Sequence, residues 1–260
     1  MSLDIAVGVS ELPILLSQLI LCFFRNQTMT SLTVKETKSS AQILEQLSNH
    51  ELNHKLKNHE VIKKIRQDFL NEEQVTFILS QYWYPIENFP SFLAGLIYCT
   101  KSVDIQTFVS KILYQELGEG NSQKAHPVIY KTTMSDAGLA LKEIINTPPL
   151  PETTSLVEMY NLPLQHKNYL KALGGLYRTE FYDLKIVSSI GRAVSNCTKA
   201  KKLPWVDIHV TQEPDHVANV EYALSCQFDS EQENEIIQGS KEMFSGWINF
   251  FNAIGNHLKI

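Results

Sequence analysis

Apolar residues recur at helical spacing along most of the chain. Between about residues 40 and 70 they stand three or four positions apart, which predicts an amphipathic helical region. Its apolar positions are Ile43, Leu44, Leu47, Leu52, Leu56, Ile62 and Ile65. A second helix is predicted to begin after Asn71, because asparagine is a favoured cap and the acidic residues that follow suit the positive end of a helix. Pro85 and Pro90 are predicted to kink this helix.

The pattern in the rest of the chain is helical too. Helical stretches are predicted over about residues 104–117, 124–146, 166–198 and 230–258, and one more element begins at Leu203. The run TPPLPETT at 147–154 is predicted to be a loop because of its prolines. We find no stretch with the alternation of a β-strand. The sequence therefore predicts an all-α fold, a bundle of about seven helices in one domain over residues 41–260.

Residues 1–40 are predicted to be an N-terminal extension that is either packed or loosely ordered. Its apolar run, Leu12–Phe24, is shorter than the roughly twenty residues that a membrane-spanning helix needs. The flanks of this run also lack the basic residues before it and the small residues after it that mark a signal peptide. An alternative is that translation starts at Met29 and that the residues before it do not belong to the natural protein.

Composition narrows the class of protein. The 260 residues include 23 basic and 28 acidic side chains, which gives a net charge of −5 and no sign of a basic surface for nucleic acid. Hydrophobic residues make up 43% of the chain, so a full core can be buried. The four cysteines are far apart and form no CxxC pair, which predicts reduced thiols in a cytoplasmic protein. They are Cys22, Cys99, Cys197 and Cys226.

A histidine–glutamate–histidine motif in the last third of the chain is the strongest sign of chemistry. His209, Glu213 and His216 are offset by four and seven residues, so on a helix their side chains share one face. Two imidazoles and a carboxylate are ligands for iron, zinc or manganese. The alternative is a structural role, in which the two histidines cap and bridge the start of a helix. Pro214 cannot donate to the carbonyl of Val210, so the helix is predicted to bend or begin within the motif.

Glu116 and His126 form a second candidate pair of metal ligands. Ten residues separate them, which would leave the two side chains about 80° apart around an ideal helix. Gly118 and Gly120 lie between them and permit the local unwinding that would turn both side chains inward. The alternative is a surface glutamate in a loop and a histidine before a proline turn.

Two further carboxylates are candidate ligands. Glu87 lies among aromatic residues and prolines, where an unpaired carboxylate is costly to bury, so it either faces solvent or is held by a metal. Glu180 falls on the apolar face of its predicted helix, where Asp183 competes with it for the inward position. The alternative for Glu180 is an exposed salt bridge with Arg178 or Lys185.

A rival motif lies near the start of the predicted domain. His50, Glu51 and His54 form a literal H-E-x-x-H, which is the pattern of zinc peptidases. Lys57 and Glu60 stand where the longer metzincin pattern requires glycine and histidine. The flanking polar residues are typical of a solvated helix face. A zinc metallopeptidase is therefore only a remote alternative.

With these residues assembled, the sequence resembles the heme-oxygenase-like diiron oxidases and oxygenases. These are relatives of the thiaminase-II and PQQ-synthesis (TenA/PqqC-like) enzymes and of the chlamydial death-domain-associating (CADD-like) protein. The stretch at 82–90 is similar to the family's aromatic-F-P helix, and the segment at 116–127 is similar to its E-x-G-x-G…H segment. The motif at 209–216 is similar to its H-x3-D-x2-H, although Glu213 stands where aspartate is usual. The resemblance covers about residues 70–225.

The resemblance implies a site for two non-heme irons in a heme-oxygenase-like bundle, with O2 as co-substrate. The implied metal ligands are Glu87, Glu116, His126, Glu180, His209, Glu213 and His216. Asp215 is an alternative to Glu213, because the proline between them puts the reach of Glu213 in question. Aromatic residues near the ligands are predicted to line a substrate pocket, and these are Tyr82, Trp83, Tyr177 and Phe181.

The function that the resemblance implies is an O2-activating oxidase or oxygenase that acts on a small metabolite, with amino-acid-derived molecules as one candidate class. The expected partner is this small molecule, with no nucleic acid and no membrane, and the chain is expected to form a homodimer. Two alternatives stay open. One is a metal-free enzyme of the thiaminase-II type, and the other is a non-enzymatic interaction scaffold. The sequence does not distinguish hydroxylation, desaturation, C–C cleavage and nitrile formation.

Overall fold

The computed structural model describes residues 38–48 and 51–260, and within these ranges the chain is helical and contains no strand. The prediction of an all-α fold is therefore confirmed. Most of the predicted extension, with Met29, Cys22 and the run at 12–24, lies outside the described residues. The helices are α2 (Lys38–Ser48), α3 (Leu52–Lys57), α4 (Glu60–Gln67), α5 (Glu72–Cys99), α6 (Val103–Glu116), the 3₁₀ helix η1 (Ser122–Lys124), α7 (His126–Asp136), α8 (Leu141–Asn146), α9 (Pro151–Gln165), α10 (Tyr169–Thr198), α11 (Pro204–Leu224) and α12 (Ser230–Leu258).

The described chain has more helices than the seven expected, because two predicted helices are interrupted and because α9 was not predicted. The region at 40–70 is divided into α2, α3 and α4. The stretch at 124–146 is divided into α7 and α8 by a turn in which Gly138 has a φ of 85°, a conformation that favours glycine. The predicted loop at 147–154 is shorter than expected, since α9 begins at Pro151. Proline is well suited to a first helical turn because its missing N–H is not needed there.

α5 begins as predicted and continues through both of the prolines that were predicted to kink it. The Asn71 side chain accepts from the Gln74 N–H while the Gln74 side chain accepts from the Asn71 N–H, which forms a capping box. The helix runs without interruption through Pro85 and Pro90 to Cys99. Its 28 residues give the domain one long wall that is buried along much of its length.

α10 lies at the centre of the domain and packs against α4, α5, α9, α11 and α12. Its contact with α12 is close because small residues lie where the two backbones meet. A Cβ on Gly174 would stand 1.9 Å from the Ile236 carbonyl oxygen, and one on Gly239 would stand 2.0 Å from the Lys171 carbonyl oxygen. Any side chain at these two positions would push the helices apart. This central helix also carries polar side chains into the interior, among them Arg178 and Glu180.

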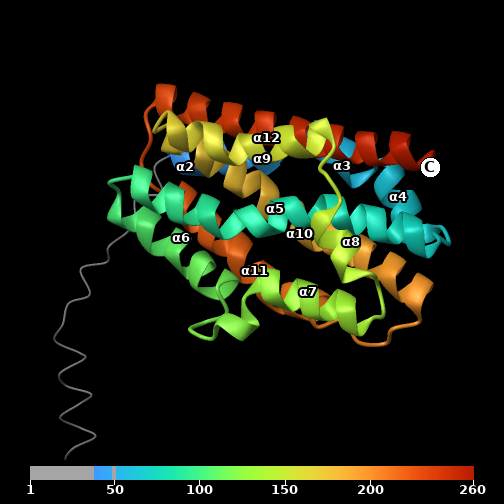
Figure 1. Cartoon of the computed structure of the whole chain (residues 1–260). Coiled ribbons are helices and arrows are strands. Elements are labelled where there is room, and N and C mark those ends of the chain that lie inside the picture. The colour runs from blue at the N-terminus through green and yellow to red at the C-terminus, as the bar shows by residue number, and fades with distance from the viewer. Residues whose placement is uncertain (1–37, 49–50) are drawn as a thin grey trace, which may run out of the picture. The chain divides into compact units, whose positions relative to one another are not determined.

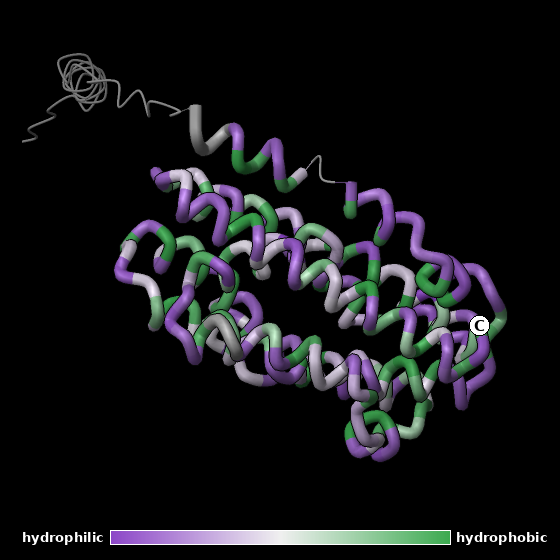
Figure 2. Tube along the Cα trace, turned by 90° about the horizontal axis from the view of Figure 1, so that it is seen from above, coloured by the Kyte–Doolittle hydropathy of each residue, from purple (hydrophilic) through white to green (hydrophobic). Residues whose placement is uncertain are grey.

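The helices lie roughly alongside one another, with α9 and α12 on one side of α5 and with α6, α7 and α11 on the other (Figure 1). Hydrophilic and hydrophobic segments alternate along the helical tubes, as expected for amphipathic helices that share a core (Figure 2). None of the described helices has the length and apolarity that crossing a bilayer requires. Cys99, Cys197 and Cys226 are free thiols, in agreement with the predicted absence of disulfides among them.

Candidate metal centre

Seven ionisable side chains meet in the interior between α6, α7, α10 and α11. Four are carboxylates and three are imidazoles. Atom pairs 3.0–3.8 Å apart link five of them into one set and the other two into a second, and rings with centroids 4.6 Å apart join the two sets. Six of the seven were expected as metal ligands from the sequence. We call the whole group the acid–histidine cluster, and its members are Glu116, His126, Glu180, Asp183, His209, Glu213 and His216.

α11 carries three members of the cluster on one buried face. His209, Glu213 and His216 are 7%, 3% and 1% exposed, as the offsets of four and seven residues predicted. The helix neither begins within the motif nor stops at Pro214, since it runs from Pro204 to Leu224. Pro214 and Asp215 are both exposed, so Asp215 faces away from the cluster and does not replace Glu213.

Glu116 and His126 are brought together by the break between α6 and α7. Glu116 is the last residue of α6 and His126 is the first residue of α7. The connection contains Gly118 and Gly120, with φ values of 82° and 86°, and a Cβ on Gly118 would stand 2.3 Å from the Asn121 carbonyl oxygen. The Glu116 Oε2 atom lies 3.0 Å from His126 Nδ1. The structure thus provides the local unwinding that the two glycines predicted.

α10 contributes two carboxylates that were expected to compete for one position. Glu180 is 3% exposed, and its Oε2 lies 3.4 Å from His216 Nδ1. Asp183 is less enclosed, with 15% of its side chain exposed, and its Oδ2 lies 3.6 Å from His209 Nε2. Its other oxygen accepts a hydrogen bond of 2.8 Å from the Tyr82 hydroxyl. Both carboxylates therefore face the cluster, and Asp183 is the member that sequence reasoning did not assign.

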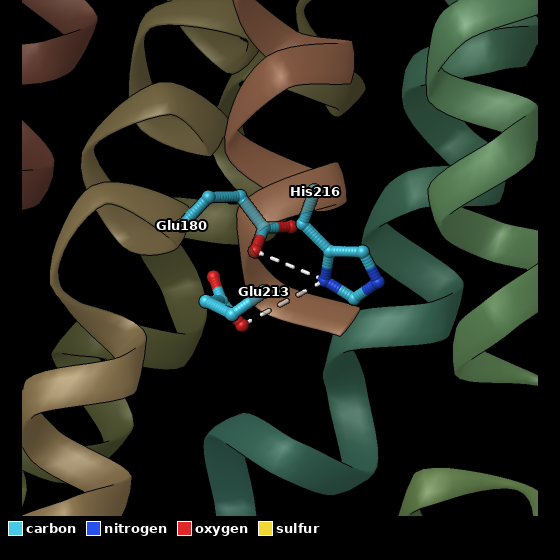
Figure 3. Close-up of side chains that lie close together, drawn as sticks. All are labelled: Glu180, Glu213 and His216. Carbon is cyan, nitrogen blue, oxygen red and sulfur yellow. Dashed lines mark ion pairs between the residues drawn. The ribbon is translucent and has the colours of Figure 1, made fainter. Parts of the chain in front are cut away.

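Glu180, Glu213 and His216 form the tightest group within the cluster. One potential ligand atom from each lies within 4.8 Å of the others, and all three side chains are buried. The two carboxylates, one from α10 and one from α11, point toward the same imidazole nitrogen (Figure 3). Glu116 Oε1 lies 3.8 Å from that nitrogen while Glu116 Oε2 contacts His126. Glu116 is therefore placed between this group and the other histidines.

The imidazole rings of His126 and His209 are held by acceptors outside the cluster. His209 Nδ1 lies 2.6 Å from the Trp205 carbonyl oxygen, and His126 Nε2 lies 3.0 Å from Gln212 Oε1. A proton on each of these nitrogens would donate to its acceptor and leave the opposite nitrogen with a lone pair that faces the carboxylates. The two rings are 4.6 Å apart between centroids.

Burial and mutual repulsion spread the pKa values of the cluster widely. Burial raises the pKa of Asp183 to about 6 and that of Glu213 well above its usual value, with the neighbouring carboxylates adding to the second shift. Burial also opposes the charge on Glu116, but His126 and His216 hold the pKa of that carboxyl at about 2. For His209, burial lowers the pKa to about 4.

Several buried atoms of the cluster have no hydrogen-bond partner. They are His126 Nδ1, Glu180 Oε1, Glu213 Oε1 and both ring nitrogens of His216. Leaving a buried polar group unsatisfied costs about 1–3 kcal/mol, and more for a charged group. Oxygen and imidazole nitrogen atoms are donors that iron, zinc and manganese accept. The unsatisfied atoms therefore fit a site whose remaining partners are metal ions.

The cluster opens onto a cavity of about 40 Å³. Glu116, His126, Glu180, Asp183 and His209 form its polar side. Its other walls are mostly apolar and come from α5, α9, α10 and α12. They include Tyr82, Pro85, Ile86, Phe89, Tyr160, Thr179 and Trp247. A cavity of this size has room for about one or two water molecules.

The predicted substrate-pocket residues are only partly brought to this cavity. Tyr82 lines it, but Trp83, Tyr177 and Phe181 do not. Trp83 instead stacks on Tyr130, and Tyr177 stacks on Phe181, which is 39% exposed. The walls from α9 and α12 were missed because nothing in the sequence near Tyr160 or Trp247 marks them as close to the ligands.

Glu87 and the H-E-x-x-H motif lie apart from the cluster. The Glu87 side chain is exposed on α5, so it is not brought to the other ligands and takes the solvent-facing alternative instead. Glu51 and His54 are exposed as well, as expected for a solvated helix face, and His50 lies outside the described residues. The structure thus gives no support to the zinc peptidase alternative.

Comparisons with known proteins agree with the fold and with the character of the site. The sequence matches the model of a family described as iron-containing redox enzymes over residues 76–247, which is more than half of the chain. No curated protein matches the chain. A CADD-like protein of unknown function from Nostoc punctiforme has a similar structure, with a TM-score of 0.70, 13% identity, and coverage of 86% of this chain and 98% of that one.

Two other solved structures show the same fold at low sequence identity. A domain of unknown function with a heme oxygenase-like fold from Shewanella denitrificans has a TM-score of 0.66 at 12% identity, with 84% of this chain and 93% of that one covered. A TenA homologue from Pyrococcus furiosus has a TM-score of 0.64 at 14% identity, with 82% and 99% covered. These likenesses show that the heme-oxygenase-like fold extends over nearly the whole described domain.

Proposed function

The chain belongs to the family of iron-containing redox enzymes, and from this premise we propose that it is a non-heme diiron oxidase or oxygenase that uses O2 to oxidise a small organic substrate. The observation that supports this most directly is the acid–histidine cluster, which is buried and has unsatisfied donor atoms. Four carboxylates would balance the charge of two divalent cations. Without such cations the same carboxylates repel one another in a poorly solvated interior.

The ligands divide into two adjacent groups. Glu180, Glu213 and His216 would hold one iron, since their donor atoms already lie within 4.8 Å of one another. His126 and His209 would hold the other, with Asp183 close to His209. The two oxygens of Glu116 face His126 and His216, which belong to different groups, so this carboxylate would contribute to both groups of ligands.

A pair of ferrous ions at this site would supply the electrons that reduce O2 and thereby drive oxidation of the substrate. The protein's own contribution is positional. Trp205 and Gln212 fix the rings of His209 and His126, and such outer contacts orient metal ligands. Tyr82 donates its hydroxyl proton to Asp183 Oδ1, which places an exchangeable proton at the wall of the cavity. The apolar walls and the small volume of the cavity limit bulk water.

Anaerobic titration with Fe(II) tests the proposal. We expect about two irons per chain for the unaltered protein, and at most one for His209→Ala or His216→Ala. His54→Ala is the matched control, because His54 is an exposed histidine outside the cluster, and it should retain both irons. Subsequent exposure to O2 should consume the gas and give a transient visible absorption band only in protein that holds both irons. Full iron occupancy in both cluster variants would show that the cluster is not the site.

A further inference from the structure

The cavity beside the cluster is too small for most organic substrates, but a larger cavity lies next to it. This second cavity has a volume of about 390 Å³, which falls in the range of roughly 300–1,000 Å³ typical of small-molecule sites. We call it the side chamber. It lies between α5, α9, α10 and α12, and its walls include Phe92, Met159, Lys171, Gly175, Glu242 and Met243.

The side chamber and the cluster cavity follow one another along the same helices. Each of three helices lines both cavities with residues three or four positions apart, which is about one helical turn. These pairs, with the side-chamber residue first, are Phe92 and Phe89, Gly175 and Thr179, and Met243 and Trp247. The repeated offset shows that the two cavities are neighbours along the helix axes.

A partition of aromatic rings separates the two cavities. Phe92, on the side-chamber side, stacks on Tyr160 with 4.8 Å between ring centroids, and Tyr160 lines the cluster cavity. Phe89 also lines the cluster cavity and lies 5.9 Å from Phe92. A ligand in the side chamber would therefore be separated from the cluster cavity by little more than these rings.

The side chamber is charged at its outer end and apolar within. Lys171 Nζ and Glu242 Oε1 form an ion pair of 3.0 Å, and the two side chains keep 28% and 42% of their exposure. Along α10, Lys171 precedes Gly175 by one turn, so the charged pair lies on the side away from the cluster. Within the described residues Glu242 Oε2 accepts no hydrogen bond, and Lys171 Nζ has used one of its three donors.

We propose that the side chamber binds an aromatic α-amino acid. Its carboxylate would pair with Lys171 and its ammonium group with Glu242. A zwitterion suits these two neighbouring side chains because it carries both charges at one end. Its ring would enter among Phe92, Met159 and Met243, since aromatic rings stack on one another and make favourable contacts with thioether sulfur. The aromatic side chain of the bound amino acid would then point toward the partition of aromatic rings. That this ligand is the substrate rests on the proposed function, whereas its binding does not.

Calorimetric titration of the full iron-free chain with L-phenylalanine tests the binding. We expect one molecule to bind per chain. Lys171→Met and Glu242→Gln should each weaken binding about tenfold or more, as for the loss of a hydrogen bond to a charged group. Lys63→Met and Glu60→Gln are matched controls, because Lys63 and Glu60 form an ion pair of 2.9 Å on α4 away from the side chamber, and they should change nothing.

Three simpler probes identify which chemical groups of the ligand the side chamber recognises. Glycine lacks the ring, 3-phenylpropanoate lacks the ammonium group and 2-phenylethylamine lacks the carboxylate, so each should bind at least about tenfold more weakly than L-phenylalanine. Binding of 3-phenylpropanoate as tightly as L-phenylalanine would overturn the zwitterion assignment. Absence of L-phenylalanine binding, or binding that Lys171→Met and Glu242→Gln leave unchanged, would overturn the site itself.

The two proposals fail separately in these measurements. Two irons per chain without L-phenylalanine binding would remove the side-chamber proposal and leave the diiron proposal intact. L-phenylalanine binding without iron binding would remove the diiron proposal and leave the side-chamber proposal intact. If both hold, L-phenylalanine should increase O2 consumption by the iron-loaded protein, and Lys171→Met should raise the concentration needed for half of that increase.

Discussion

Arg178 and Glu180 are two residues apart on α10, yet they enter two different kinds of buried polar group. Arg178 donates to Ser240 Oγ, to the Asn53 side chain and to the Leu47 carbonyl oxygen, so its guanidinium is well satisfied and ties α2, α3 and α12 to α10. Glu180 enters the acid–histidine cluster, where several buried atoms lack partners. The first group is completed by the chain itself, whereas the second is incomplete until something binds. Satisfaction of hydrogen bonds thus separates a structural network from a binding site.

The largest expected effect is a loss of stability when the hydrogen bonds of Arg178 are removed. Arg178→Met removes three hydrogen bonds from a charged donor, to the Leu47 carbonyl, to Asn53 and to Ser240, and a hydrogen bond of this kind contributes about 1.5–3 kcal/mol. We expect the free energy of unfolding, measured with urea, to fall by about 3 kcal/mol or more. Arg192→Met, at an exposed arginine on the same helix, is the control and should change it little.

The iron content of the same Arg178→Met variant tests whether the Arg178 network and the acid–histidine cluster are independent. Where the variant is still folded, we expect it to bind as many irons as the unaltered protein. A folded variant that loses iron would mean that Arg178 belongs to the site and that the two groups are not independent.

Gln212→Leu should have the next largest effect, on metal affinity. Gln212 accepts from His126 Nε2 at 3.0 Å, and loss of such an outer contact typically lowers metal affinity about 10–100-fold. Competition with a chelator under anaerobic conditions measures the change, and Gln67→Leu at an exposed glutamine is the control. Unchanged affinity would show that the packing around His126 suffices to orient its ring.

Glu213→Gln should stabilise the iron-free protein while it impairs metal binding. Burial and the charges of Glu180 and Asp183 raise the pKa of Glu213, so this carboxyl destabilises the iron-free fold at neutral pH. We expect a gain on the order of 1 kcal/mol in the free energy of unfolding, as for other substitutions that relieve strain at a functional site. Glu158→Gln, at an exposed glutamate, should show no gain. A loss of stability in Glu213→Gln would show that the Glu213 carboxyl stabilises the iron-free fold, as Arg178 does.

The smallest expected effect is a pH dependence of the iron-free protein. Burial opposes the charge on His216, but Glu180 and Glu116 outweigh it and raise the pKa of His216 to about 9. Stabilisation from the protonated ring is complete below the unfolded pKa of about 6.5 and is lost as the pH rises through 9. The raised pKa of Glu213 acts in the same direction.

Urea unfolding of iron-free protein at pH 6.5 and pH 9 measures this dependence. We expect the free energy of unfolding to fall on the order of 1 kcal/mol between these pH values. His216→Asn should flatten the trend. Iron-loaded protein should show no such fall, because metal binding displaces protons from its ligands and is favoured at higher pH. An iron-free protein that gains stability toward pH 9 would contradict the assignment of a proton to His216.

The parts of the site that were predicted from sequence are those whose geometry is local. His209, Glu213 and His216 lie on one helix, so their spacing alone placed them on one face. The turn after Glu116 was signalled by glycines that adopt positive φ. Asp183 was not assigned, because two inward carboxylates less than one turn apart cannot be ranked without knowing how α10 is rotated.

Errors arose where tertiary packing decides the outcome. Glu87 stands among aromatic residues that are mostly buried, yet the rotation of α5 places this one side chain in solvent. The breaks within 40–70 and 124–146 were missed because the apolar periodicity continues across them. Among the described residues of these breaks, only Gly138 has a positive φ. Trp247 and Tyr160 reach the cluster cavity from α12 and α9, which no local pattern reveals.

The order of the ligands along the chain sets when the protein can acquire its metal. Synthesis delivers Glu116 and His126 first, and these two alone cannot hold an ion firmly. The remaining ligands, from α10 and α11, emerge later, and α12, which contributes Trp247 to the cavity wall, follows them. Because domains fold as units once enough of the chain is available, metal loading must follow the synthesis of the domain through α12. The iron supply would then meet a folded domain rather than a partly synthesised one.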